Sequence, residues 1–127
     1  MANLVQVEAN AILNATSGQA TYTNPTAPVK VALVTTTGTA TTAGTEVTGG
    51  SYARTAITFA AASAGSISSN AAVTFTNMPA CTVTGVDEWD SFGTPVRRWF
   101  GALSANKTVN AGDTFTIASG SYTKTLS

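Results

Sequence analysis

The chain has 127 residues, no histidine, one cysteine, and six basic against six acidic residues, so its net charge is zero. So few acid–base and thiol groups leave little for catalysis or transition-metal binding, and we predict no enzymatic activity, no bound metal and no cofactor. The lack of a basic excess argues against a nucleic-acid partner, because affinity for nucleic acid comes mainly from lysine and arginine at the phosphates.

The chain is expected to form one β-rich domain. Threonine occurs 24 times, and β-branched residues favour strands. The first residues have neither the basic start nor the apolar stretch of a signal peptide, so we expect synthesis in the cytosol without secretion by that route. No apolar run approaches the roughly 18 residues of a membrane span, and we predict no membrane partner.

Only one segment, residues 4–15, shows a helical pattern. Ala9, Ile12 and Leu13 follow the i, i+3, i+4 spacing of one helix face. The alternative is an extended arm that docks on a neighbouring molecule. Residues 19–28 contain two prolines and are typical of a linker.

Beyond the linker the apolar pattern changes to a period of two, with Val29, Val31 and Leu33 on one face. Turn residues then separate short runs at spacings typical of an all-β sandwich. The expected strands are 29–35, 51–59, 71–78, 81–90, 96–103, 107–110, 114–118 and 122–126, with a short edge strand near 45–48 inside a loop at 36–50 and another loop at 60–70. We therefore predict an antiparallel β-sandwich, Ig-like or jelly-roll-like, at 29–127, preceded by an arm or short helix and linker at 1–28.

The charged residues concentrate in one predicted hairpin, which carries Asp87, Glu88, Asp90, Arg97 and Arg98. A turn centred near Gly93 places Asp90 opposite Arg97 and Glu88 opposite Trp99. Opposite charges on facing strand positions stabilise a hairpin, so we predict a ladder of ion pairs. The alternatives are a patch at a protein interface, a hard-cation site built from carboxylates, and a glycosidase-type carboxylate pair.

Three further features have both a structural and a functional interpretation. Cys81 lies in an apolar strand and is expected to be a small buried residue rather than a reactive thiol. Arg54 is a lone charge in an apolar strand, which favours an exposed edge residue or an ion pair between subunits. Trp89, Tyr52 and Tyr122 are the candidates for an aromatic platform that binds carbohydrate.

An ordered series of sequence blocks resembles a family of small virion proteins of tailed bacteriophages, common in phages of actinobacteria and often labelled tail fibre or minor tail protein. The blocks are residues 9–14, 44–54, 57–59, 71–75, 99–103 and 109–117. The resemblance covers nearly the whole chain and implies a virion structural protein, made in the host cytoplasm, that binds other virion proteins.

Within this resemblance we expect a capsid decoration protein that binds and stabilises the shell of the major capsid protein, as a homo-oligomer such as a trimer. The alternatives are a minor tail or tail fibre protein and a module that binds carbohydrate on the host surface. The residues expected at the interface are Leu4, Val5, Ile12, Leu13, Arg54, Trp89, Asp90, Arg97 and Arg98.

Overall fold

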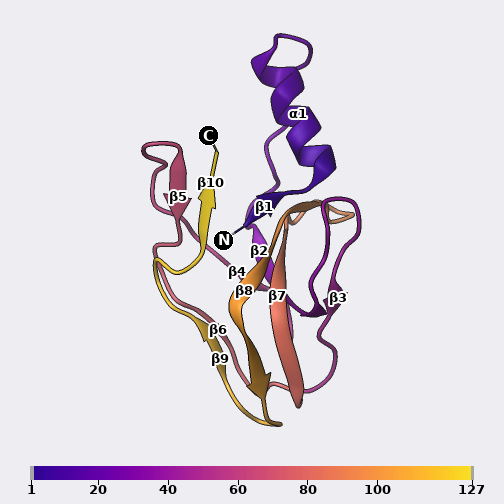
Figure 1. The fold of residues 1–127 in the computed structure, drawn as a ribbon, viewed down its shortest axis with the longest axis vertical. Helices are drawn as coiled ribbons and strands as arrows, with labels where there is room; N and C mark the ends of the chain where they lie inside the picture. Colours follow the sequence, from indigo (N-terminus) through magenta and orange to yellow (C-terminus); the bar gives the residue numbers. More distant parts are fainter. Residues whose placement is uncertain (1, 127) are drawn as a thin grey trace.

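The computed structural model describes residues 2–126, which form one helix and ten strands (Figure 1). The strands are β1 (Asn3–Leu4), β2 (Lys30–Thr36), β3 (Thr45–Glu46), β4 (Thr55–Ala56), β5 (Ser66–Ser68), β6 (Val73–Phe75), β7 (Cys81–Trp89), β8 (Arg97–Val109), β9 (Phe115–Ile117) and β10 (Thr123–Thr125), and the helix α1 spans Gln6–Thr16. The named strands pair in antiparallel fashion. The prediction of an antiparallel β-sandwich preceded by an arm or short helix is confirmed, and the N-terminal segment takes the helical form.

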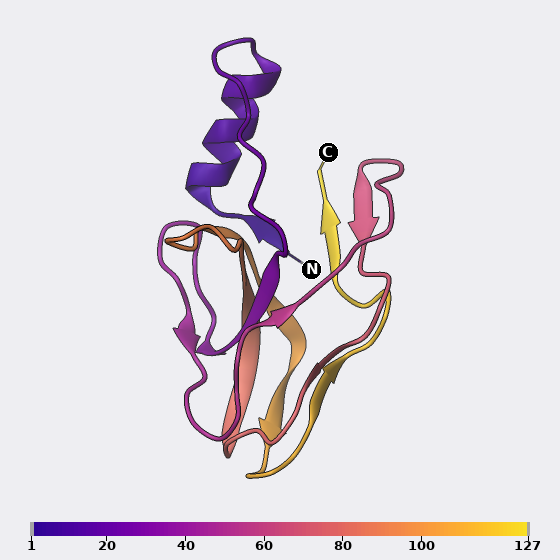
Figure 2. The same ribbon diagram turned by 180° about the vertical axis from the view of Figure 1, so that it is seen from behind.

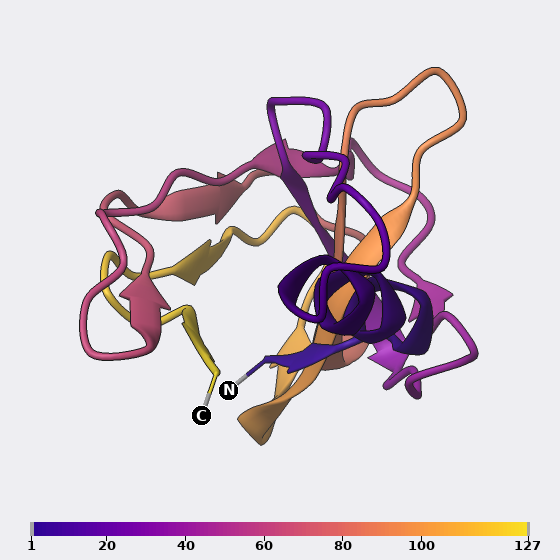
Figure 3. The same ribbon diagram turned by 90° about the horizontal axis from the view of Figure 1, so that it is seen from above.

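The sandwich consists of one main sheet and two small ribbons. The main sheet has the order β1-β8-β7-β2-β3, and β4 also pairs with β2. The ribbons pair β6 with β9 and β5 with β10. Figure 3 shows both ribbons on one side of the main sheet, with β3 and its loops on the other side.

The hydrophobic core lies between the main sheet and the ribbons. Val31 and Leu33 of β2 are completely buried there, as their alternation along the strand predicts. The ribbons contribute Phe75 and Phe115, whose rings meet edge to face with centroids 6.2 Å apart. Tyr122, just before β10, is fully buried in the same core.

The other face of the main sheet is covered by the loop between β2 and β3. Two glycines allow this loop to approach closely. A Cβ at Gly44 would lie 2.6 Å from Thr36 O, and a Cβ at Gly85 would lie 2.8 Å from Thr37 Oγ1 and 2.4 Å from Gly101 O. Glycine is thus required at both positions by lack of space, since a side chain at Gly44 would push the loop from β2 and one at Gly85 would push β7 from β8 and from the loop.

Two predicted elements are wrong in the middle of the chain. The strand expected at 51–59 is reduced to β4, because a turn at Gly49 and Gly50, both with positive φ, redirects the chain. The loop expected at 60–70 contains β5, which pairs with β10. Its small serine-rich sequence lacks the bulky β-branched residues that usually indicate a strand.

The two strands expected at 96–103 and 107–110 form a single strand, β8, with a large bulge at the expected turn. Val83 of β7 is opposite Lys107, whereas Gly85 is opposite Ala102. Residues 103–106 therefore have no partner on β7. The bulge bends β8 away from its neighbour at this point.

The N-terminal segment is a helix, preceded by an extended stretch that belongs to the main sheet. β1 pairs with β8 through Asn3–Phe100 and Leu4–Trp99. Helix α1 then projects from one end of the sandwich (Figures 1 and 2). A domain boundary after residue 28 stays a prediction. No helix in the described residues is long and apolar enough to cross a membrane.

Candidate functional site

The carboxylates of Asp87, Glu88 and Asp90, here called the β7 carboxylates, are at most 2% exposed. Each one binds a different segment of the chain. Asp87 holds the β2–β3 loop, Glu88 holds β10, and Asp90 holds β8 and, through Arg98, helix α1. Their common role is to attach peripheral segments to the central strand.

Glu88 lies on the core side of the sheet, where it accepts hydrogen bonds from Tyr122 and Lys124. The Tyr122 Oη–Glu88 Oε2 distance and the Lys124 Nζ–Glu88 Oε1 distance are both 2.9 Å. Burial, and then the charge and hydrogen bond of Glu88, raise the pKa of Tyr122 well above its ordinary value. The alternation of Tyr122 and Lys124 along one strand face is the only sequence signal of this cluster.

Asp90 belongs to a chain of contacts that reaches the helix. Arg98 Nη2 lies 2.9 Å from Asp90 Oδ2, and Arg98 Nη1 lies 2.6 Å from Glu8 Oε2. Burial opposes the charged form of Asp90, but hydrogen bonds from the Val96 N–H, from Arg98 and from the Phe92 N–H lower its pKa below the ordinary value.

At the helix, this series of contacts ends at a tyrosine that binds Glu8. Tyr22, in the linker after α1, donates a hydrogen bond to Glu8. Burial, together with the hydrogen bond to Glu8 and its charge, raises the pKa of Tyr22 to about 12. Glu8 is only 3% exposed, so this contact sequesters a charge that the sequence pattern places on a helix surface.

The predicted ladder exists, but one of its expected pairs is wrong. Glu88 is opposite Trp99, as expected, whereas Arg97 is opposite Trp89 instead of Asp90. A bulge after Glu88 shifts the register by one residue, so Asp90 pairs with Arg98. Arg97, which counting from the turn assigns to Asp90, pairs with Asp87 instead.

Arg97 and Asp87 hold the β2–β3 loop on the face away from the ribbons. Arg97 Nη1 lies 3.1 Å from Asp87 Oδ1, and Arg97 Nη2 donates to Thr39 O at 2.7 Å. The Gly44 N–H donates to Asp87 Oδ2 at 2.9 Å. The β7 carboxylates thus point to separate cationic partners, and no cluster of metal-ligating residues occurs within residues 2–126.

The three candidate aromatic residues are not arranged as a carbohydrate platform. The Trp89 ring is covered by the Arg54 guanidinium, whose Cζ lies 4.2 Å from the ring centroid. Tyr52 stacks on Phe75, and Tyr122 is completely buried. Each of these rings is therefore engaged within the chain, and the three do not form one exposed surface.

Contacts within residues 2–126 account for both Arg54 and Cys81. Arg54 also forms a salt bridge with Glu46, with 2.9 Å between Nη2 and Oε1. Neither an ion pair between subunits nor an unpaired edge charge is needed to explain it. Cys81 is half-buried against the core, and burial raises the pKa of its thiol, as expected for a residue that packs rather than reacts.

Four of the expected interface residues lie in the N-terminal segment, and only one of them is exposed. Val5 is buried, and Leu4 and Ile12 are half-buried against the rest of the chain. Leu13 is 62% exposed, and Val7, which is not among the expected interface residues, is 72% exposed.

Val7, Asn10 and Leu13 follow one another at intervals of three along α1, and we call this surface the α1 ridge. All three side chains are exposed and uncharged. The opposite face of the helix carries Glu8 and packs against the linker and β8. The signal for the ridge was present in the sequence as two apolar residues six positions apart in a predicted helix.

A second surface feature is a groove between β8 and β9, here called the β8–β9 groove. Its volume is about 700 Å³, and it is lined by Ala102, Leu103, Ser104, Ala105, Lys107, Thr114, Phe115, Thr116, Ile117, Ala118 and Ser121. The bulge in β8 forms one wall and the free edge of β9 forms the other.

Comparison with known proteins gave one informative result. Residues 3–125 match the model of a protein family described as Podophage GP4 fiber I protein gp80. A search of curated proteins found no match. The matched segment contains α1 and all ten strands described above. The chain therefore belongs to the family described as Podophage GP4 fiber I protein gp80.

Proposed function

We propose that this protein is a non-enzymatic subunit of a phage fibre and that copies of it associate through the α1 ridge. The observation that carries the proposal is the exposure of Val7 and Leu13, at 72% and 62%, on a helix that projects from the sandwich. Exposed large apolar side chains grouped on one surface are typical of contact sites.

The family description supports a fibre subunit, the alternative interpretation of the sequence, over a capsid decoration protein. A fibre is part of the virion, so this role agrees with a partner among the other virion proteins. The three candidate carbohydrate-binding rings are covered or buried. The host-surface carbohydrate module therefore receives no support from these residues.

The short helix itself supports association. An isolated helix of 11 residues is marginal in water, and α1 has neither a side-chain N-cap nor a basic residue in its last turn. Its inner face is held by the Glu8–Arg98 ion pair. Its outer face gains stability only if another molecule covers it.

A second copy of this chain fits the α1 ridge because the ridge carries no charge. Symmetric association brings identical surfaces together, and charged ridges would repel one another. Val7 and Leu13 supply apolar contact, while Asn10 between them supplies a polar group that pairs with its counterpart and selects one register. We propose a closed homo-oligomer of this kind, of which the expected trimer is one form.

The non-enzymatic part of the proposal is supported by the state of the acidic residues. Each β7 carboxylate is buried and paired with a basic side chain of the same chain. A carboxylate held in this way has no open position for substrate. Their arrangement serves the rigidity of the domain.

The test compares oligomeric mass in solution. The double variant Val7→Ser/Leu13→Ser should sediment as a monomer at concentrations where the natural chain is an oligomer, with a similar melting temperature. Phe92→Ser is the matched control, because Phe92 is 59% exposed in the β7–β8 turn and lies outside the ridge. The control should keep the natural mass.

Assembly into phage particles is the second readout. The double variant should be depleted from purified particles, whereas Phe92→Ser should be retained. A natural chain that is monomeric at every concentration, or a double variant that remains oligomeric, would refute the ridge as the contact. Abundance on the head rather than in the fibre, measured by labelling electron microscopy, would refute the fibre assignment separately.

A further inference from the structure

The β8–β9 groove is open to solvent although both of its walls are strands. We propose that it accepts an extended segment of another virion protein, which adds as a strand between β8 and β9 and places a carboxylate beside Lys107. This site is separate from the α1 ridge, so the failure of either proposal leaves the other standing.

The backbone of both walls is available for pairing. Residues 103–106 of β8 have no partner on β7, and β1 pairs only with Trp99 and Phe100 farther along the same strand. On the other wall, β9 pairs with β6 along one edge only. Free strand edges are templates for an added strand, because their N–H and C=O groups lack partners.

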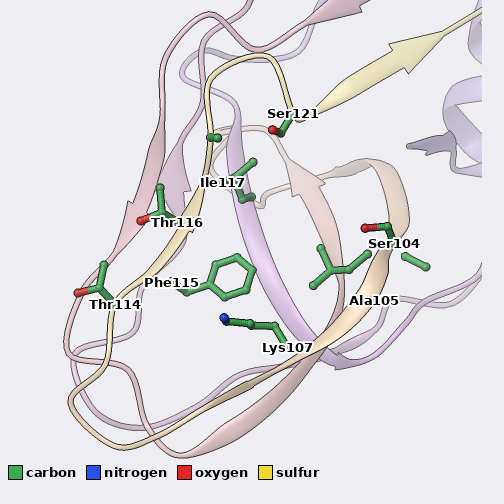
Figure 4. Close-up of a pocket in the computed structure, with 11 residues that line it drawn as sticks. Ser104, Ala105, Lys107, Thr114, Phe115, Thr116, Ile117 and Ser121 are labelled. Atoms are coloured by element: carbon green, nitrogen blue, oxygen red, sulfur yellow. The ribbon is translucent and has the colours of Figure 1, made fainter.

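The groove has the lining that an added strand requires. Figure 4 shows Phe115 and Ile117 directed toward the space between the strands, with Thr114 and Thr116 turned away from it. Leu103 contributes further apolar surface from β8. Alternate side chains of an incoming strand would enter this apolar floor while the others face solvent.

Lys107 determines the chemistry of the occupant. Among residues 2–126 it takes part in no salt bridge, and it points into the groove region (Figure 4). Pairing this edge with the same edge of a second copy would bring two Lys107 side chains to one seam, which edge lysines normally prevent. A foreign segment that carries a carboxylate removes this repulsion and gains an ion pair.

The addition would also close the sandwich. On this side β1 covers the edge of β8 only at Trp99 and Phe100, so the rest of that edge ends the main sheet, and the β6–β9 ribbon is a separate sheet. A strand placed between them would join the two into one continuous sheet, so binding and completion of the fold would occur together.

The probe is a short synthetic peptide that alternates valine and threonine around one central glutamate. Hydrogen exchange of the natural full-length chain should show protection of the amides of residues 103–106 when this peptide is added. A second peptide with lysine in place of glutamate, and a third with proline beside the glutamate, should bind about tenfold more weakly.

One protein variant reverses the charge at position 107, and the other keeps it as a control. Lys107→Glu should bind the lysine peptide in preference to the glutamate peptide, and Lys107→Arg should retain the natural preference. In phage particles, Lys107→Glu should be depleted relative to Lys107→Arg, at equal melting temperature. Both variants keep the ridge residues, so their mass in solution should be unchanged.

Three results would overturn the proposal. The first is protection of these amides that rises with protein concentration without peptide, because a second copy would then occupy the groove. The second is equal binding of the proline peptide, since backbone pairing would be absent. The third is equal occupancy of Lys107→Glu and Lys107→Arg in particles.

Discussion

Lys124 and Glu88 form a buried ion pair, with 2.9 Å between Lys124 Nζ and Glu88 Oε1, although 36 positions separate them in the chain. The ammonium group also lies 4.0 Å from the centroid of the Phe59 ring. The pair attaches the last strand to the central strand of the main sheet. Its burial makes it sensitive to the loss of either partner.

Replacing Lys124 alone should therefore destabilise the protein strongly. Lys124→Met leaves the Glu88 carboxylate buried without a cation and should lower the free energy of unfolding by about 3–5 kcal/mol. The double variant Glu88→Met/Lys124→Met should recover much of this loss, because no buried charge remains. Urea denaturation of the single and double variants measures both effects, and a single variant as stable as the natural chain would contradict the argument.

Acid should weaken the connection between the hairpin and the helix. The pKa of Asp90 is lower in the folded chain than its ordinary value, so below about pH 4 the unfolded chain binds more protons than the folded one. The contribution of Asp90 is present above this pH and is lost as the pH falls through its folded pKa.

Denaturation midpoints at neutral and acid pH test this expectation. Asp90→Asn should be less stable than the natural chain at neutral pH, and its stability should fall less on acidification. An equal acid-dependent loss in both proteins would show that Asp90 makes no contribution to it.

The tyrosines should resist alkali. The chain has three tyrosines, and the pKa of each is raised above 10, with burial as the main cause and a neighbouring glutamate as the second. The neutral form is therefore favoured in the folded chain, and the contribution of the tyrosines to stability should be constant below pH 10 and decline above it.

Ultraviolet absorbance of phenolate provides a direct measurement. The native protein should show little phenolate near pH 10.5, whereas the chain in denaturant should titrate all three tyrosines around pH 10. A tyrosine that ionises normally in the native protein would disprove the corresponding buried contact. Tyr22→Phe removes the only tyrosine in the linker, so the difference between its absorbance titration and that of the natural chain reports the ionisation of Tyr22.

The close approach of β8 and of the β2–β3 loop to β7 should make Gly85 intolerant of substitution. In Gly85→Ala, the new Cβ would lie 2.4 Å from Gly101 O, so the strands must move, and stability should fall by about 1–3 kcal/mol or more. Gly93→Ala is the matched control, because no atom lies within 4 Å of its Cβ position. A control that loses as much stability as Gly85→Ala would show that close packing is not the cause.

The sequence predicted the elements whose cause is local. Alternation over Val31 and Leu33 predicted β2, and the Gly–Pro turn after Asp90 predicted the β7–β8 hairpin. The apolar spacing of Ile12 and Leu13 indicated a helix at α1, with an extended arm as the alternative. Side-chain periodicity and turn chemistry act over a few residues, so they can be recognised without knowing what each segment packs against.

The strand at β5 and the pairing of Asp90 with Arg98 were decided by tertiary structure. The serine-rich β5 becomes a strand only because β10 lies beside it. The register at Asp90 depends on a bulge that the turn residues of the hairpin do not predict. Likewise, Glu8 and Lys124 look like surface charges in the sequence, but distant segments bury them. Burial and register arise from contacts between residues far apart in the chain, and a one-residue bulge is sufficient to change the partner of Asp90 from Arg97 to Arg98.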